Sequence, residues 1–281
     1  MPRNPVRHAL STYLFVEHRV TVALLDRILK SGIKEIEFFC ARQHLDYHNK
    51  SQIVELGHWL RDSEMSVHSF HSPLFSDDVW GRSGPRSVVS LTEKSKARRI
   101  EVTDEIKRVI EIADTIPFRY LIQHVGMEDE EFEEDKLEAA FNCLDELIVF
   151  GKQLGVKILV ENTPNDFSSA QRLQYLLSTT HLPISFCFDT GHANLHKGVE
   201  YEFLLMKDRI RSTHIHDNDG KEDIHLFPLN SEGGSVEWTP TMELLRTLPE
   251  DVPLVMELRE DDEMENPLTE ARRSLDRLEE L

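Results

Sequence analysis

Residues 157–192 read KILVENTPNDFSSAQRLQYLLSTTHLPISFCFDTGH and contain two short apolar runs on either side of an amphipathic stretch. The apolar runs predict strands at 157–161 and 184–189, and the stretch between them predicts a helix at 168–178. Two strands joined by a helix form a parallel βαβ unit. Both strands are largely apolar, as expected for a sheet that is covered on both faces.

The same alternation continues in both directions from this unit. Further strands are predicted at 10–16, 35–40, 67–71, 120–125, 210–216 and 253–258. The other predicted helices cover 20–31, 51–63, 102–115, 135–154, 201–207, 239–245 and 267–280. No strand is followed by a Gly-x-Gly-x-x-Gly motif, and 281 residues are close to the roughly 250 of one α/β barrel. We therefore predict a single (β/α)₈ TIM-barrel domain over residues 1–281, with eight parallel strands.

Composition narrows the classes of partner. The formal net charge of −19 repels nucleic acid at long range, so a nucleic-acid partner is disfavoured, although a local basic patch keeps it open. No apolar run approaches the ~20 residues that span a bilayer, and no secretory signal follows Met1, so we expect a cytoplasmic protein without a membrane partner. The sequence leaves a homodimer open. The three cysteines, Cys40, Cys143 and Cys187, are expected to be buried small hydrophobes.

Polar residues gather where the predicted strands end, which in this fold is where active sites form. Imidazoles and carboxylates dominate this set: Glu37, His71, His124, Glu161, Asp189, His192, His214, His216, Asp223, His225 and Glu257. A buried carboxylate is costly unless it is paired or bound to a metal, and few lysines or arginines lie at the strand ends. The sequence therefore predicts a divalent-metal site, and ligands without thiolate suit Zn²⁺ or Mn²⁺.

The strand-end motifs, taken in chain order, resemble those of a known family of barrels. Its most specific pieces are Asp189-Thr-Gly-His192 and His214-Ile-His-Asp-Asn-Asp-Gly220, together with Glu161 and Glu257. Over nearly its whole length the chain resembles the xylose-isomerase-like barrel superfamily. That superfamily contains sugar-phosphate isomerases and epimerases as well as three-zinc apurinic/apyrimidinic endonucleases.

The isomerase and epimerase relatives imply one metal, held by Glu161, Asp189, His214 and Glu257. By this resemblance Glu161 and Glu257 flank the substrate and move a proton next to a carbonyl. His192 would touch a substrate hydroxyl or support the metal.

The three-zinc relatives imply a larger ligand set, and all of its positions are present here. The first metal would take His71, His124 and Glu161, the second Glu161, Asp189, His214 and Glu257, and the third His192, Asp223 and His225. Clustered metals activate water for phosphoester cleavage. The resemblance thus implies one to three ions per chain.

Three interpretations follow: two kinds of enzyme and a non-enzymatic metal-binding protein. The acidic charge and the four-ligand core favour a metal-dependent isomerase or epimerase of a small sugar or sugar phosphate. The complete set of nine ligands supports a phosphodiesterase related to the apurinic/apyrimidinic endonucleases, although no duplex-binding surface is evident.

Several residues are candidates for substrate contact besides His192. The long segment 72–99 is locally basic, and we expect either a lid whose Arg82 or Arg86 binds a substrate phosphate or carboxylate, or an ordinary solvated loop. Glu37 either contacts substrate or pairs with an arginine, and His216 either contacts substrate or supports the metal ligands. Regular alternation would place His68 and His71 on opposite faces of their strand, so His71 is chosen as the ligand.

Overall fold

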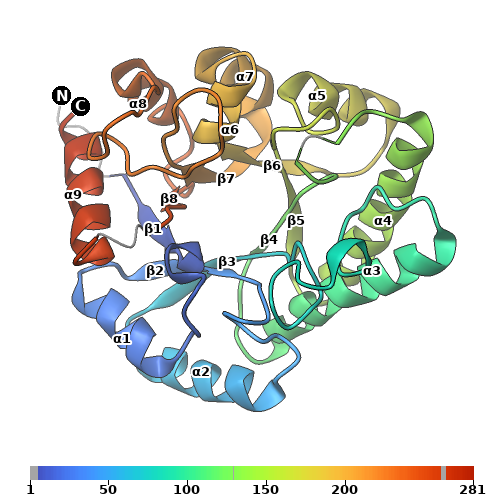
Figure 1. The fold of residues 1–281 in the computed structure, drawn as a ribbon, viewed down its shortest axis with the longest axis horizontal. Coiled ribbons are helices and arrows are strands. Elements are labelled where there is room, and N and C mark those ends of the chain that lie inside the picture. The colour runs from blue at the N-terminus through green and yellow to red at the C-terminus, as the bar shows by residue number, and fades with distance from the viewer. Residues whose placement is uncertain (1–5, 129, 261–263) are drawn as a thin grey trace.

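The computed structural model describes residues 6–128, 130–260 and 264–281. Eight parallel strands form a closed barrel in chain order, and β8 pairs with β1 (Figure 1). They are β1 (His8–Ser11), β2 (Glu35–Phe39), β3 (Ser66–His71), β4 (Tyr120–Gln123), β5 (Lys157–Glu161), β6 (Ser185–Asp189), β7 (Ile210–Ile215) and β8 (Leu254–Met256). The predicted (β/α)₈ barrel is confirmed.

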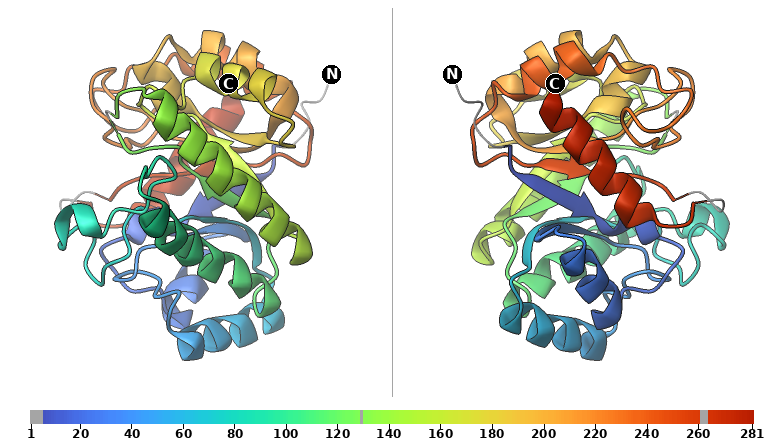
Figure 2. Two further views of the ribbon diagram at one scale, coloured as in Figure 1. Left: turned by 90° about the vertical axis from the view of Figure 1, so that its right-hand side faces the viewer. Right: turned by 90° about the vertical axis from the view of Figure 1, so that its left-hand side faces the viewer.

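Helices surround the barrel on its outside, as both side views show (Figure 2). They are α1 (Val22–Lys30), α2 (Lys50–Asp62), α3 (Lys96–Ile110), α4 (Glu134–Gln153), α5 (Ala170–Thr179), α6 (Thr190–Leu195), α7 (Val199–Met206), α8 (Trp238–Leu245) and α9 (Pro267–Glu280). Short 3₁₀ turns are η1 (Thr12–Phe15), η2 (Gly84–Arg86), η3 (Glu111–Asp114) and η4 (Lys207–Arg209). Within the described residues, no helix is both long and apolar enough to cross a membrane.

The main core lies between the strands and the helices, where each helix buries its apolar face. Polar caps fix where helices begin: Thr21 accepts a hydrogen bond from Leu24 N, and Asn266 accepts one from Thr269 N. A smaller apolar cluster of Tyr120, Ile122, Leu159 and Cys187 comes from the three consecutive strands β4, β5 and β6. All three cysteines are buried and free, as predicted.

Three element predictions were wrong. The strand expected at 10–16 ends at Ser11, because the Ser11 hydroxyl accepts from Tyr13 N and starts η1. Leu14 and Phe15 are buried there, so the run is apolar without being extended. The helix expected from 102 already begins at Lys96, and the short helix α6 was not predicted.

A bulge in β3 also overturns the expectation for His68. The pairing of β2 with β3 slips between Ile36–Val67 and Glu37–Ser69, which breaks the alternation of side chains. His68 Nε2 therefore lies 3.0 Å from Ser212 Oγ of β7, on the far side of the barrel. Both His68 and His71 point into the barrel, and only His71 reaches the end at which the strands terminate.

Candidate metal centre

All nine predicted ligands meet at the carboxyl end of the barrel. Most are buried, and His124 and Asp223 are partly exposed. They fall into three groups, and within each group the ligand atoms lie within 4.8 Å of one another; the first two groups share Glu161. The grouping matches the three sets that the sequence resemblance implies, with His216 added to the third.

The first group joins His71 of β3, His124 after β4 and Glu161 of β5. The Nε2 atoms of the two histidines are 3.2 Å apart, and they lie 3.4 and 3.1 Å from Glu161 Oε2. His71 Nδ1 faces the Ser72 carbonyl oxygen at 2.9 Å, so this carbonyl fixes the ring with Nε2 toward Glu161.

The second group contains Glu161, Asp189, His214 and Glu257. His214 Nδ1 lies 2.9 Å from Glu161 Oε1, 3.2 Å from Glu257 Oε2 and 3.8 Å from Asp189 Oδ2. The other ring nitrogen of His214 lies 3.2 Å from Glu37, which also accepts a hydrogen bond of 2.7 Å from the Ser69 hydroxyl. Glu37 is fully buried behind His214. Its carboxylate thus orients a candidate ligand, and it neither borders the mouth nor pairs with an arginine among the described residues.

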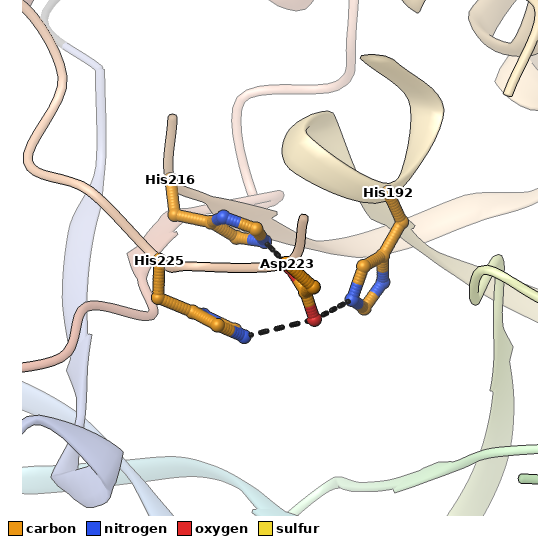
Figure 3. A group of neighbouring side chains, drawn as sticks. All are labelled: His192, His216, Asp223 and His225. Carbon is orange, nitrogen blue, oxygen red and sulfur yellow. Dashed lines mark hydrogen bonds and ion pairs between the residues drawn. The ribbon is translucent and has the colours of Figure 1, made fainter. Parts of the chain in front are cut away.

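The third group surrounds Asp223 in the loop after β7 (Figure 3). His192 Nε2 and His225 Nε2 lie 3.0 and 3.2 Å from Asp223 Oδ2. His216 Nε2 lies 3.0 Å from Asp189 Oδ1 and 3.7 Å from Asp223 Oδ1, and its ring stacks on His225 with centroids 3.9 Å apart. His216 therefore belongs beside the candidate ligands and links the second and third groups.

Backbone carbonyls orient two of these imidazoles. His192 Nδ1 faces Asn162 O at 2.8 Å, and His225 Nδ1 faces Glu257 O at 2.9 Å. Asn162 itself is held by Asp189, whose backbone N donates to the Asn162 side chain at 2.8 Å. Such contacts fix which ring nitrogen points to the site.

The charges of the groups are strongly coupled. Burial alone would raise the pKa of Glu161, but the imidazoles of His214 and His124 lower it well below its ordinary value. Burial lowers the pKa of His225, yet Asp223 more than offsets this and raises it to about 9. The imidazoles around these carboxylates thus favour their charged form.

The donor set fits a divalent cation. Among the described residues, the buried carboxylates Glu161, Asp189 and Glu257 and the partly exposed Asp223 have histidines, and neither lysine nor arginine, as ion-pair partners. Asp223 Oδ1 is buried without a hydrogen-bond partner in the described structure. Cys187 lies beside Glu161 and His214, but burial raises the pKa of its thiol far above the ordinary value, which disfavours a thiolate ligand. These clusters therefore suggest a divalent metal bound by nitrogen and oxygen.

A cavity of about 280 Å³ opens above the three groups. Tyr13, Phe39 and Trp80 form an aromatic wall, with ring centroids 4.8 Å apart for Tyr13 and Phe39 and 5.3 Å apart for Phe39 and Trp80. Arg259 lines the same cavity. These four residues were missed in the sequence, although Phe39 and Arg259 lie at or just beyond the ends of strands.

The loop after β3 faces the cavity with its apolar residues. Leu74, Phe75 and Trp80 line the cavity, whereas Arg82 and Arg86 are exposed to solvent. The expectation that these two arginines reach the substrate is therefore not supported by their positions.

The comparisons with known proteins agree with this architecture. The family described as xylose isomerase-like TIM barrel matches residues 25–281. Protein MJ1311 of Methanocaldococcus jannaschii is 25% identical over 234 residues, which are 79% of this chain and 74% of that protein. MJ1614 of the same organism is 27% identical over 135 residues, 47% of this chain, and the match spans about half of its length, 53%.

Two solved structures show the same fold. A D-tagatose 3-epimerase-like protein superposes with a TM-score of 0.77 at 20% identity, covering 98% of this chain and 97% of that one. The IolI protein with a bound zinc atom superposes with a TM-score of 0.76 at 14% identity, covering 97% of both chains.

Proposed function

Since this chain belongs to the xylose isomerase-like TIM barrel family, we propose that it is a divalent-metal-dependent isomerase or epimerase of a small sugar or sugar phosphate. The observation that carries the proposal is the pair of buried carboxylates, Glu161 and Glu257, which both contact His214 Nδ1, at 2.9 and 3.2 Å. The cavity above them has the size of a small molecule. Similarity to a D-tagatose 3-epimerase-like protein supports the same substrate class.

An epimerase requires a base and an acid on opposite sides of one carbon, and an isomerase requires a base that serves two neighbouring carbons. A Zn²⁺ or Mn²⁺ ion held by Glu161, Asp189, His214 and Glu257 would polarise the substrate oxygens. Glu257 borders the cavity and takes the proton from the carbon next to the carbonyl, while the C–H electron pair moves toward the carbonyl oxygen. In an epimerase Glu161 must enter the cycle protonated and delivers this proton to the other face of the same carbon, after which Glu257 loses its proton to solvent and Glu161 regains one. In an isomerase Glu257 returns its own proton to the neighbouring carbon.

Solvent deuterium exchange tests this proposal. Protein loaded with Zn²⁺ or Mn²⁺ is expected to place deuterium next to the carbonyl of at least one member of a panel of ketoses and ketose phosphates, followed by NMR. Glu257→Gln is expected to slow the exchange by at least about 100-fold, the usual effect of losing an acid–base group. Absence of exchange across the panel would contradict the proposal.

Arg61→Gln is the matched control. Arg61 is exposed in the last turn of α2, at the opposite end of the barrel, and its loss should leave exchange unchanged.

One observation favours a second candidate, a metal-dependent phosphodiesterase with two or three ions. Glu161 Oε2 faces His124 at 3.1 Å while Oε1 faces His214 at 2.9 Å, so this carboxylate joins two complete ligand groups. Elemental analysis separates the candidates: one ion per chain favours proton transfer, and three ions with nicking of abasic-site DNA favour hydrolysis. The net charge of −19 disfavours a nucleic-acid substrate.

A further inference from the structure

One positively charged side chain stands at the mouth of the site. Of the described residues that line the mouth cavity, Arg259 is the only lysine or arginine. It also lines an adjoining groove of about 680 Å³, whose wall carries the exposed Lys221 together with the carboxylates of Glu128, Glu130, Asp166, Glu222 and Asp223. Arg259 thus lies where the cavity above the candidate ligands continues outward.

The chain after β8 explains this placement. The backbone N–H groups of Glu257 and Arg259 donate to Ile215 O at 3.3 Å and His225 O at 3.2 Å. The chain therefore continues along its neighbour beyond β8, with Leu258 turned into the core. Alternate residues of an extended chain share a face and are separated by about 6–7 Å. Arg259 accordingly faces the same mouth as Glu257, farther from the barrel.

Among the described residues, no side chain pairs with the guanidinium of Arg259. Across residues 6–128, 130–260 and 264–281, Arg259 has no side-chain hydrogen bond or ion pair, although Asp223 and Glu257 border the same cavity. Other arginines of this acidic chain do pair with carboxylates, as Arg42 does with Asp78 and Arg273 with Glu270. A planar guanidinium suits a phosphate or carboxylate, which it can bind through two parallel hydrogen bonds.

We infer that Arg259 binds an anionic group of the substrate, so that the substrate is a sugar phosphate or sugar acid and not a neutral sugar. The inference rests on the proposed function and narrows its substrate class. The reacting carbon lies over Glu257, the anionic group lies at the junction with the groove, and the carbon skeleton packs on the aromatic wall formed by Tyr13, Phe39 and Trp80. A chain with a net charge of −19 repels free anions, so the loss of this one cation should have a large effect.

Equilibrium binding with matched ligand pairs tests the inference without requiring turnover. The metal-loaded protein is titrated with D-fructose against D-fructose 6-phosphate, D-ribulose against D-ribulose 5-phosphate, and D-glucose against D-glucuronate. The wild type should bind the charged member of at least one pair about tenfold or more tightly, the effect of a charge-assisted hydrogen bond. Which pairs show the preference distinguishes phosphate from carboxylate.

Substitutions of Arg259 test whether the tighter binding of the charged ligand is due to Arg259 or to the metal. Arg259→Gln should reduce the preference to near unity and leave the affinity for the neutral sugar unchanged, and Arg259→Lys should retain part of it. Arg61→Gln, which removes one charge at the other end of the barrel, should retain all of it. A wild type without any such preference, or an Arg259→Gln variant that keeps it, overturns the inference. If the preference depends on Arg259 but no ketose exchanges deuterium, the anion site stands and the proposed isomerisation fails.

Discussion

Gly191 allows the second and third ligand groups to touch. A Cβ atom at this position would lie 2.0 Å from His216 Cε1 and 2.4 Å from its Nδ1. The missing side chain lets the start of α6 approach β7, where Asp189 accepts hydrogen bonds from His192 N at 2.7 Å and from the His216 ring. The glycine of the Asp189-Thr-Gly-His192 motif is thus required by packing, and the motif works as a unit.

Gly191→Ala should therefore destabilise the protein by overpacking, by about 1–3 kcal/mol in urea unfolding. The clash is with one ring, so the loss of that ring should relieve it. The double variant Gly191→Ala/His216→Ala is expected to cost at least about 1 kcal/mol less than the sum of the two single variants. Strictly additive costs would show that the methyl group is accommodated without moving His216.

At the scale of elements, the loop between β3 and α3 is an ordered wall of the cavity. Asp77 accepts hydrogen bonds from Gly81 N at 3.1 Å and Ser83 N at 2.7 Å, and Ser76 N donates to Ser87 O at 2.7 Å. Arg98 of α3 donates to Val88 O at 3.1 Å. These bonds close the loop on itself and hold Trp80 against the mouth.

Trp80→Ala should consequently raise KM by about tenfold or more and change kcat much less, because it removes a wall of the binding cavity and not a reacting group. Arg82→Ala and Arg86→Ala should leave both constants unchanged, since their side chains are exposed. Steady-state kinetics on the substrate found by deuterium exchange makes the comparison. A raised KM in the arginine variants, with Trp80→Ala unaffected, would restore the arginines as substrate-binding groups.

The position of a residue along a barrel strand decides at which end of the barrel its side chain lies, and the sequence alone predicts that position. The nine candidate ligands lie together because the barrel requires strand ends to converge, a property of the whole fold. His68 was misplaced because a bulge leaves no trace in the pattern of apolar residues. Tyr13 was not predicted to line the cavity, because an apolar run can be buried equally well by a strand and by a 3₁₀ turn, and the turn is what forms here. Which side of a loop faces a cavity depends on contacts between residues distant in sequence. The sequence therefore does not show that Trp80 lines the cavity while Arg82 and Arg86 face solvent.

At the scale of the whole molecule, two buried neutral histidines link stability to pH. Burial lowers the pKa of both His44 and His68 to about 4. His44 lies under the loop after β1, where its ring nitrogen Nδ1 donates to the carbonyl oxygen of His18 and Nε2 is buried without a partner among the described residues. Burial therefore disfavours the charged form of either ring in the folded protein.

The sign of the effect follows from where the protons bind. Between about pH 6.5 and 4 the unfolded chain binds protons at these histidines and the folded chain does not, so stability falls as the pH falls through this window. The shift of His44 corresponds to roughly 3 kcal/mol, fully present above pH 6.5 and lost toward pH 4. His44→Gln should therefore reduce the slope of unfolding free energy against pH by about one proton over this window. His58→Gln, a change at an exposed histidine of α2, should leave the slope as in the wild type. Both variants retain the metal centre, so the difference between them separates the titration of His44 from that of the metal centre. Equal slopes of unfolding free energy against pH in the two variants would mean that His44 is already protonated in the folded protein at pH 5.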